Sequence, residues 1–240
     1  MTRHVAVRTF ANAAAAMTVA RSASVFAAST EAPRPWEAAP REGFGASQWR
    51  ERHARLAADV ARRQSRVIFF GDSLFERFAS TGAQSWRARF TDTDAMLVAT
   101  NGDTTQDALW HIDHNMFDDA APRTVVILIG TNDLPHFPPR DCARGIAAVV
   151  DRLRERVPSA KILLLGLLPR YDSPVLHAGA VAVNAILAAK NFDTRVHYRD
   201  IGMHVAGQEP QPSRAYDSDA LHLTAVGYAR LADAISAELF

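Results

Sequence analysis

Five short, continuous apolar runs alternate with helical patterns along most of this chain. The runs cover residues 67–70, 95–99, 125–129, 162–168 and 196–201. Each run is taken as continuous instead of alternating, which is typical of strands that are covered on both faces, although the last run also contains His197, Arg199 and Asp200. Amphipathic or apolar helical patterns occur at residues 47–63, 107–114, 142–157, 181–190 and 225–239. This alternation predicts an α/β protein with a parallel sheet between two layers of helices and right-handed crossovers.

Length and composition fit one globular domain that follows an extension. The 240 residues are 48% hydrophobic and 22% charged, which indicates a folded chain with a sizeable core. The formal net charge is +1 and no long Lys/Arg block occurs, so a nucleic-acid partner is not expected. Cys142 is the only cysteine, which excludes an internal disulfide, and we expect a buried or half-buried thiol. We predict an N-terminal extension over residues 1–45 and a single domain over residues 46–240.

The first thirty residues differ in composition from the rest of the chain. They contain three arginines, no acidic residue and much Ala, Ser and Val, which resembles an export signal. The alternative is a disordered or wrongly assigned extension, in which case the protein is cytoplasmic instead of periplasmic or secreted. No apolar run is long enough to span a membrane. Residues 31–45 contain three prolines and are expected to form a linker or an arm over the surface.

Polar residues follow the apolar runs at the points where the predicted strands end. Asp72 and Ser73 follow the first run, and Asn101-Gly102-Asp103 follows the second. Gly130-Thr131-Asn132-Asp133 follows the third, and the segment 219–222 follows the fifth after a long loop. Ligands of parallel sheets bind outside the carboxyl ends of the strands. We therefore expect these four segments to form one site.

Three residues of these segments have the chemistry of a catalytic triad. Ser73 lies where a strand is expected to turn into a helix, and its hydroxyl needs a base to become a nucleophile near neutral pH. His222 could take that proton, with Asp219 three residues earlier to hold the imidazole. Asp217 is a competing acid, although the three-residue spacing favours Asp219. Taken alone, Ser73 also fits a simple helix N-cap.

Three further groups could stabilise negative charge on a substrate oxygen. The Ser73 amide lies at a predicted helix N-terminus, where backbone N–H groups are free. Gly102 has no Cβ, so its amide can approach a substrate closely. Asn132 offers a side-chain amide. Singly, Gly102 also fits a turn and Asn132 an Asx-turn, but together they place donors and nucleophile at neighbouring strand ends, which favours a serine hydrolase.

Other candidate residues are weaker. His111 and His114 lack a third ligand at a suitable spacing, so we expect surface or helix-cap histidines and no metal site. Asp72 and Asp133 are expected to brace the loops of the site. Arg170 follows the fourth run, either as a substrate contact or in a surface ion pair. No glycine-rich nucleotide motif occurs, and no cofactor is predicted.

The four segments resemble the four blocks of the SGNH/GDSL hydrolase superfamily. The match is closest to the branch of the platelet-activating-factor acetylhydrolase catalytic subunits, as Leu163-Leu164-Leu165-Gly166-Leu167-Leu168-Pro169-Arg170 and His222-Leu223-Thr224 indicate. The resemblance runs from about Trp49 to the C-terminus. It implies a three-layer α/β/α sandwich with a flavodoxin-like five-stranded parallel sheet. It also implies Ser73 as nucleophile, His222 as base, Asp219 as its partner, and an oxyanion hole of the Ser73 and Gly102 amides with the Asn132 side chain.

Two segments depart from the pattern of this branch. The second block lacks several of the usual glycines, so its loop can differ in shape. After the nucleophile, Phe75-Glu76-Arg77-Phe78 is bulky and charged, and we expect it to narrow or recharge the mouth of the pocket.

We predict a serine esterase that hydrolyses short-chain acyl esters, above all acetyl esters, of a small-molecule, glycan or lipid substrate through an acyl-enzyme. The alternatives are a thioesterase or lysophospholipase with the same machinery, or a non-catalytic module that binds an acylated glycan. Residues 202–215 are expected to shape the substrate site. Because His222 must be neutral to act, activity is expected to fall below about pH 6–7. Members of the branch can pair, so a homodimer is a further option.

Overall fold

The computed structural model describes Met1 and residues 32–239. The predicted export signal lies outside the described residues. Within the described part of the chain, no helix is both long enough and apolar enough to span a membrane. The division into an extension of residues 1–45 and a domain of residues 46–240 stays a prediction.

A five-stranded parallel sheet forms the centre of the described domain, with strand order β2-β1-β3-β4-β5. The strands are β1 (Val67–Gly71), β2 (Ala95–Ala99), β3 (Thr124–Leu128), β4 (Lys161–Leu165) and β5 (Val196–Arg199). This order is that of the flavodoxin-like doubly wound sheets, in which the chain reverses its direction of winding between β1 and β3. The predicted fold class is thus confirmed.

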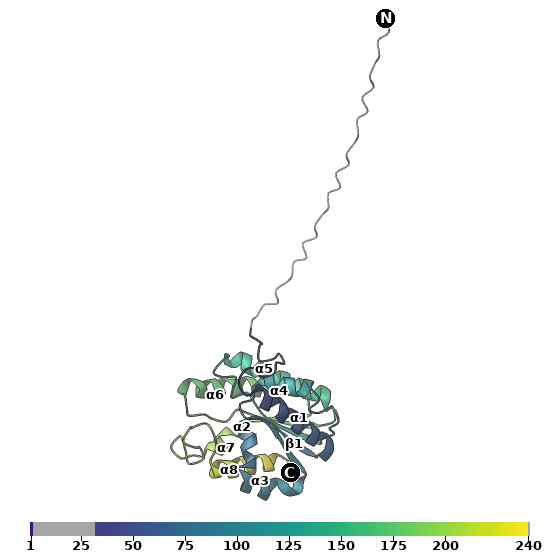
Figure 1. Ribbon diagram of the computed structural model, residues 1–240. Helices are drawn as coiled ribbons and strands as arrows, with labels where there is room; N and C mark the ends of the chain where they lie inside the picture. Colours follow the sequence, from purple (N-terminus) through teal and green to yellow (C-terminus); the bar gives the residue numbers. More distant parts are fainter. Residues whose placement is uncertain (2–31, 240) are drawn as a thin grey trace. The chain divides into compact units, whose positions relative to one another are not determined.

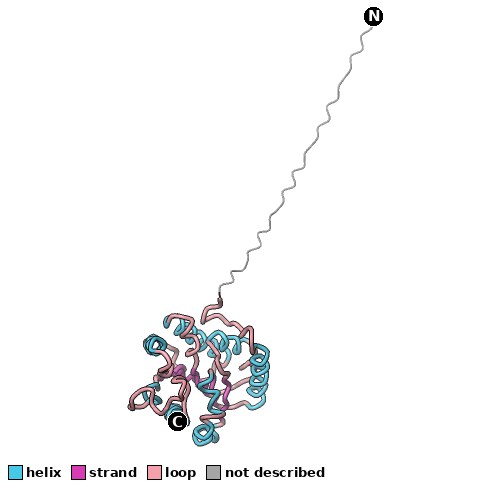
Figure 2. Tube along the Cα trace, turned by 60° about the vertical axis from the view of Figure 1, so that its left-hand side comes forward, coloured by secondary structure: helices cyan, strands magenta, loops and turns pink. Residues whose placement is uncertain are grey.

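Helices cover both faces of the sheet. They are α1 (Ala46–Arg63), α2 (Ser73–Glu76), α3 (Ala83–Phe90), α4 (Thr105–Asp113), α5 (Pro139–Arg156), α6 (Pro174–Ala188), α7 (Gly202–Ala206) and α8 (Ala225–Leu239), with 3₁₀ turns at Arg77–Ala79 and Thr91–Thr93. Figure 1 shows α1, α4, α5 and α6 on one face and α2, α3, α7 and α8 on the other. Figure 2 shows the strands between these two layers.

Each layer has its own hydrophobic core, because successive side chains of a strand point to opposite faces. Ile68 and Phe70 of β1 pack in the core beneath α1, α4, α5 and α6. Val67 and Phe69 of the same strand pack in the core on the other face. Burial on both faces explains why β1 to β4 read as nearly continuous apolar runs, whereas the edge strand β5 carries exposed His197 and Arg199.

Most predicted elements are present, and the differences have local causes. Helix α6 begins at Pro174, seven residues before its predicted start, because the Ser173 hydroxyl accepts a hydrogen bond from the Leu176 amide as an N-cap and Pro174 takes the first helical position. β4 ends at Leu165, so residues 166–170 lead away from the sheet towards the site. Two short helices, α3 and α7, were not predicted.

The register of the sheet brings the candidate segments to one edge. Gly71 at the end of β1 pairs with Ala99 of β2 and Leu128 of β3. Ser73, Gly102 and Asn132 therefore follow aligned strand ends within four residues of them. The ends of β1 and β3 can lie this close because Gly71 has no side chain: a Cβ at its position would lie 2.1 Å from the Leu128 carbonyl oxygen.

Candidate active site

Ser73 is held at the sharp turn from β1 into α2. Asp72 caps this helix: its Oδ1 accepts a hydrogen bond from the Leu74 amide at 2.9 Å. Ser73 is buried, with 4% of its surface exposed. The helix is only four residues long before it tightens into the 3₁₀ turn. The buried Asp72 side chain thus fixes the turn that carries Ser73.

The residues after the nucleophile do not narrow the pocket as the sequence suggested. Phe75 and Phe78 are fully buried in the core beneath α2 and α3. Glu76 forms an ion pair with Arg52 of α1 at 2.8 Å. The bulky side chains after Ser73 therefore stabilise the fold, and the prediction that they crowd the mouth was wrong.

The segment from Asp217 to His222 forms a compact turn that carries its own acid and base. The Asp217 amide donates to the His222 carbonyl at 2.8 Å. Asp219 Oδ1 accepts from the amides of Leu221 at 3.0 Å and His222 at 2.8 Å. Ala220 takes a left-handed backbone conformation with φ 56°. The turn orients the second carboxylate oxygen of Asp219 towards the imidazole.

Ser73, His222 and Asp219 form a continuous hydrogen-bonded chain. His222 Nε2 lies 2.9 Å from Ser73 Oγ, and His222 Nδ1 lies 2.6 Å from Asp219 Oδ2. Burial would raise the pKa of Asp219, but hydrogen bonds from the His222 ring and from the backbone amides of His222 and Leu221 outweigh it and lower this pKa to about 2. Asp217 instead bonds its own neighbour Ser218. The geometry thus brings together the three residues predicted as a triad.

The three predicted oxyanion donors lie at the ends of β1, β2 and β3. Gly102 has a φ of 75°, which a side chain would strain. Asn132 Nδ2 donates to the Asp103 carbonyl at 2.8 Å, so one amide hydrogen is held and the other stays available. In the described chain, neither the Ser73 amide nor the Gly102 amide donates to another protein group. All three therefore have N–H groups free to donate.

Two buried carboxylates brace the loops around the nucleophile. Asp133 Oδ2 accepts a hydrogen bond from the Thr105 amide at 3.0 Å, and its Oδ1 lies 2.6 Å from the Thr105 hydroxyl oxygen, which ties the third block to the start of α4. Asp72 Oδ2 is buried and has no hydrogen-bond partner among the described residues. Burial raises the pKa of each carboxyl to about 7. Their contacts agree with the predicted bracing role.

A buried polar network beneath the second block was missed in the sequence. The Asp103 carboxylate accepts from Trp49 Nε1 at 2.8 Å and from His111 Nε2 at 3.0 Å. His111 Nδ1 in turn lies 2.8 Å from His53 Nδ1. Burial lowers the pKa of both histidines to about 4, so both rings are neutral near pH 7. His111 then donates through Nε2 and accepts the Nδ1 proton of His53.

The network corrects one prediction about the histidines. His111 is 1% exposed and is neither a surface nor a cap residue, whereas His114 is the C-cap of α4. The signal that could have revealed the network is the pair Trp49 and His53, four residues apart on one face of α1. A single sequence does not say which distant residue such a pair meets.

Arg170 braces the third block from the other side. Its Nη1 donates to the Thr131 carbonyl at 2.9 Å, and its Nη2 forms an ion pair with Asp172 at 2.6 Å. Its side chain is 6% exposed. The ion-pair alternative is therefore the one observed, with Arg170 buried and Asp172 exposed. Arg170 fixes the backbone next to Asn132.

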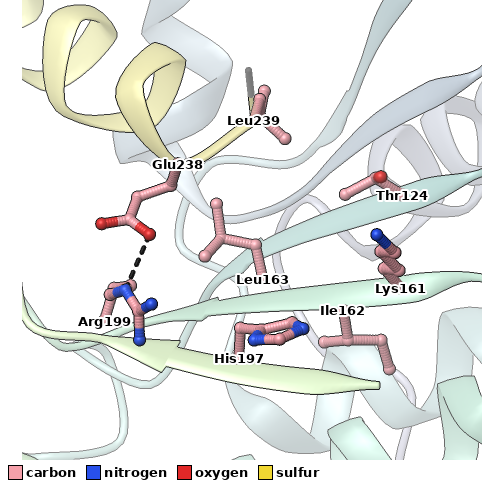
Figure 3. A pocket seen from close by; sticks show the side chains of 8 residues that line it. All are labelled: Thr124, Lys161, Ile162, Leu163, His197, Arg199, Glu238 and Leu239. Atoms are coloured by element: carbon pink, nitrogen blue, oxygen red, sulfur yellow. Dashed lines mark hydrogen bonds and ion pairs between the residues drawn. The ribbon is translucent and has the colours of Figure 1, made fainter. Parts of the chain in front are cut away.

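Four surface hollows of the described domain are lined without Ser73 or His222. Figure 3 shows one of about 340 Å³ beside the C-terminus of α8, lined by Lys161, Leu163, His197 and their neighbours, with the Arg199–Glu238 ion pair at its edge. Because Thr124 and Lys161 begin β3 and β4, this hollow reaches the amino ends of the strands, opposite the candidate site. Three others, of about 320 to 530 Å³, are also lined without Ser73 or His222.

Comparisons with known proteins identify the family of this chain. The model of the GDSL-like lipase/acylhydrolase family matches residues 69–230. The chain is 30% identical over 186 residues to platelet-activating factor acetylhydrolase IB subunit alpha1 of Bos taurus, covering 77% of this chain and 79% of that protein. It is 31% identical over 189 residues to subunit alpha2 of Rattus norvegicus, covering 78% and 81%.

Two solved structures share the fold at lower identity. A GDSL-like lipase from Bacteroides thetaiotaomicron superposes with a TM-score of 0.61 at 18% identity, covering 80% of this chain and 97% of that one. An acetylxylan esterase from Geobacillus stearothermophilus gives 0.57 at 15% identity, covering 73% and 94%. With the family model matching well over half of its length, this chain belongs to the GDSL-like lipase/acylhydrolase family and is an ester-cleaving hydrolase.

Proposed function

We propose that this protein is a serine esterase that removes short acyl groups, above all acetyl, through a Ser73–His222–Asp219 triad and an acyl-enzyme. The observation that carries the proposal is the unbroken chain of two hydrogen bonds, 2.9 and 2.6 Å long, from the Ser73 hydroxyl to the Asp219 carboxylate. The fold places this chain where aligned strand ends meet free N–H donors.

In the first half of the reaction Ser73 Oγ attacks the ester carbonyl carbon. His222 Nε2 takes the serine proton, and the Asp219 carboxylate stabilises the resulting imidazolium by accepting a hydrogen bond from its Nδ1–H group at Oδ2. Negative charge develops on the former carbonyl oxygen and is stabilised by the Ser73 and Gly102 amides and the free hydrogen of Asn132. His222 then gives its proton to the departing alcohol, and Ser73 stays acylated.

In the second half a water molecule replaces the alcohol. His222 removes a proton from this water as it attacks the acyl carbon, and the same three donors stabilise the second tetrahedral intermediate. Collapse of that intermediate releases the carboxylic acid and returns the proton to Ser73 Oγ. No group besides these residues and water is required.

A short acyl group is favoured by the relatives that are 30 and 31% identical to the chain, which are named as acetylhydrolases. A thioesterase or lysophospholipase would use the same residues with a different leaving group, and it is the second candidate because the triad does not discriminate between them.

The test combines a substrate series with loss of the nucleophile. Hydrolysis of p-nitrophenyl acetate should be faster than that of the butyrate and much faster than that of the octanoate. Ser73→Ala should lower kcat by about 10⁴-fold or more, because no nucleophile remains. Near wild-type turnover by Ser73→Ala would end the assignment of the triad. An octanoate preference would overturn only the acetyl proposal.

A further inference from the structure

The segment of residues 33–45 packs along the start of α4 and against α5. The Thr105 hydroxyl donates to the Pro35 carbonyl at 2.8 Å, and the Ala39 amide donates to the Gln106 carbonyl at 3.3 Å. The Arg144 guanidinium of α5 lies 3.7 Å from the centre of the Trp36 ring. We call this segment the arm, and it lies wholly outside residues 69–230 that the family model matches.

One side chain of the arm reaches the loop of Gly102. Arg41 Nη1 donates to the Asn101 carbonyl at 3.2 Å, and its Nη2 donates to Asp103 Oδ1 at 3.2 Å. A Cβ on Gly102 would lie 3.4 Å from Arg41 Nη2. The guanidinium therefore bonds the residues on both sides of Gly102 and lies next to this exposed glycine.

The contact continues from this loop to the third oxyanion donor. Asp103 holds Arg41 with its carboxylate, and its backbone carbonyl accepts the Asn132 side chain at 2.8 Å. The carboxylate is also fixed by Trp49 Nε1. A shift of Asp103 would thus move Gly102 and Asn132 together.

The Arg41 contact joins a partly exposed guanidinium to a buried carboxyl group. The Arg41 side chain is 28% exposed, and that of Asp103 is 3% exposed. Arg41 also lies 3.5 Å from Asp107 Oδ2, which belongs to the capping box of α4. A guanidinium presents several N–H donors in a rigid plane, so it can bond two acceptors at fixed positions, which an ammonium does less well.

We propose that Arg41 is a positioning residue for the oxyanion hole, and that the arm is a working part of the catalytic apparatus. This proposal rests on the proposed function, because it acts through Gly102 and Asn132. Oxyanion donors act on charge that develops only in the transition state, so loss of their alignment lowers kcat more than it changes KM. A misaligned donor should cost less than a deleted one.

The experiment measures p-nitrophenyl acetate hydrolysis by Arg41→Ala, Arg41→Lys and the matched control Arg62→Ala. Arg62 is an exposed arginine that forms its ion pair with Asp59 on the far turn of α1. We expect Arg41→Ala to lower kcat about tenfold to a hundredfold with KM changed less than about threefold. Arg41→Lys should recover part of this loss, and Arg62→Ala should match the wild type. Arg41→Ala with kcat within twofold of wild type would overturn the proposal.

A double-mutant cycle separates positioning from a general effect on the fold. In the Asn132→Ala background, Arg41→Ala should cost much less than in the wild type, because one of the groups it positions is gone. Equal losses in both backgrounds would show that Arg41 acts independently of the oxyanion hole and would overturn the proposal. If Arg41→Ala does not fold, Arg41→Gln, which keeps one hydrogen bond, takes its place in the cycle.

Ser73→Ala is measured in parallel to keep the two proposals apart. Loss of activity in Ser73→Ala with an unchanged Arg41→Ala overturns the role of the arm alone. Retained activity in Ser73→Ala overturns the proposed function, and the role of Arg41 with it.

Discussion

The two sides of the catalytic serine are built in contrasting ways. The acid–base side is local: Asp219 and His222 belong to one turn of six residues, and the Asp219 side chain is 46% exposed. The oxyanion side is long-range: Asp103, at its centre, is 3% exposed and is held by residues from the arm, from α1 and from α4.

This contrast has an energetic consequence. The acid and base are oriented by two backbone amides within three residues, so their geometry needs little help from the rest of the fold. The loop of Asn101, Gly102 and Asp103 depends on buried hydrogen bonds between distant segments of the chain. An unpaired buried polar group there costs about 1–3 kcal/mol. We therefore expect substitutions on the local side to affect activity alone. Substitutions on the long-range side should affect activity and stability together.

The largest loss of kcat is expected from a substitution on the local, acid–base side. In Asp219→Asn, Oδ1 can still accept the two amides, but the new NH₂ group faces His222 Nδ1 and donates to it. The imidazole must then carry its proton on Nε2, where it cannot accept the serine proton. We expect kcat to fall about 10³- to 10⁴-fold with an unchanged urea midpoint. An Asp219→Asn variant that also loses stability would contradict the expectation that substitutions on the local side affect activity alone.

On the long-range side, Asn132→Ala should lower kcat about 10²- to 10³-fold, as for other deleted oxyanion donors. It also removes the donor to the Asp103 carbonyl. The free energy of unfolding should therefore fall by about 1 kcal/mol, unlike in Asp219→Asn. Steady-state kinetics and urea unfolding on the same preparations measure both effects. A kcat within fivefold of wild type would remove Asn132 from the oxyanion hole.

The pH profile tests how independent the local side is. The pKa of Asp219 is lowered to about 2, so this group stays ionised throughout the range above pH 4. A histidine must be neutral to act as a general base, so log kcat/KM should fall as the pH drops from 8 to 5. A rate that is flat from pH 5 to 8 would contradict this assignment.

The smallest effect on kcat is expected from the buried network of Trp49, His53, Asp103 and His111. Trp49→Phe removes the Nε1 donor of Asp103 and keeps an aromatic ring, so we expect unfolding to become easier by about 1–3 kcal/mol and kcat to fall only a few-fold. Trp86→Phe is the matched control, because Trp86 packs among Phe69, Phe78 and Phe90 on the other face of the sheet. A control variant with the same kinetic loss would show that the effect comes from packing.

The same contrast explains what the sequence could predict. The four strands β1 to β4 were found because they are largely buried on both faces and almost wholly apolar, and Asp219 and His222 were found because their spacing alone allows the bond. Ser73, Gly102 and Asn132 follow from the placement of polar residues at strand ends. His53, Trp49 and Arg41 were not assigned, because their partners lie 54 to 62 residues away in the chain and no local pattern encodes such a pairing.

Covalent labelling with a fluorophosphonate tests the triad most directly, since the reagent needs both an activated serine and an oxyanion hole. Mass spectrometry of the labelled wild type should show one adduct, on the peptide that contains Ser73, and His222→Ala should be labelled far more slowly. An adduct on another residue, or equal labelling rates in the two proteins, would contradict the account.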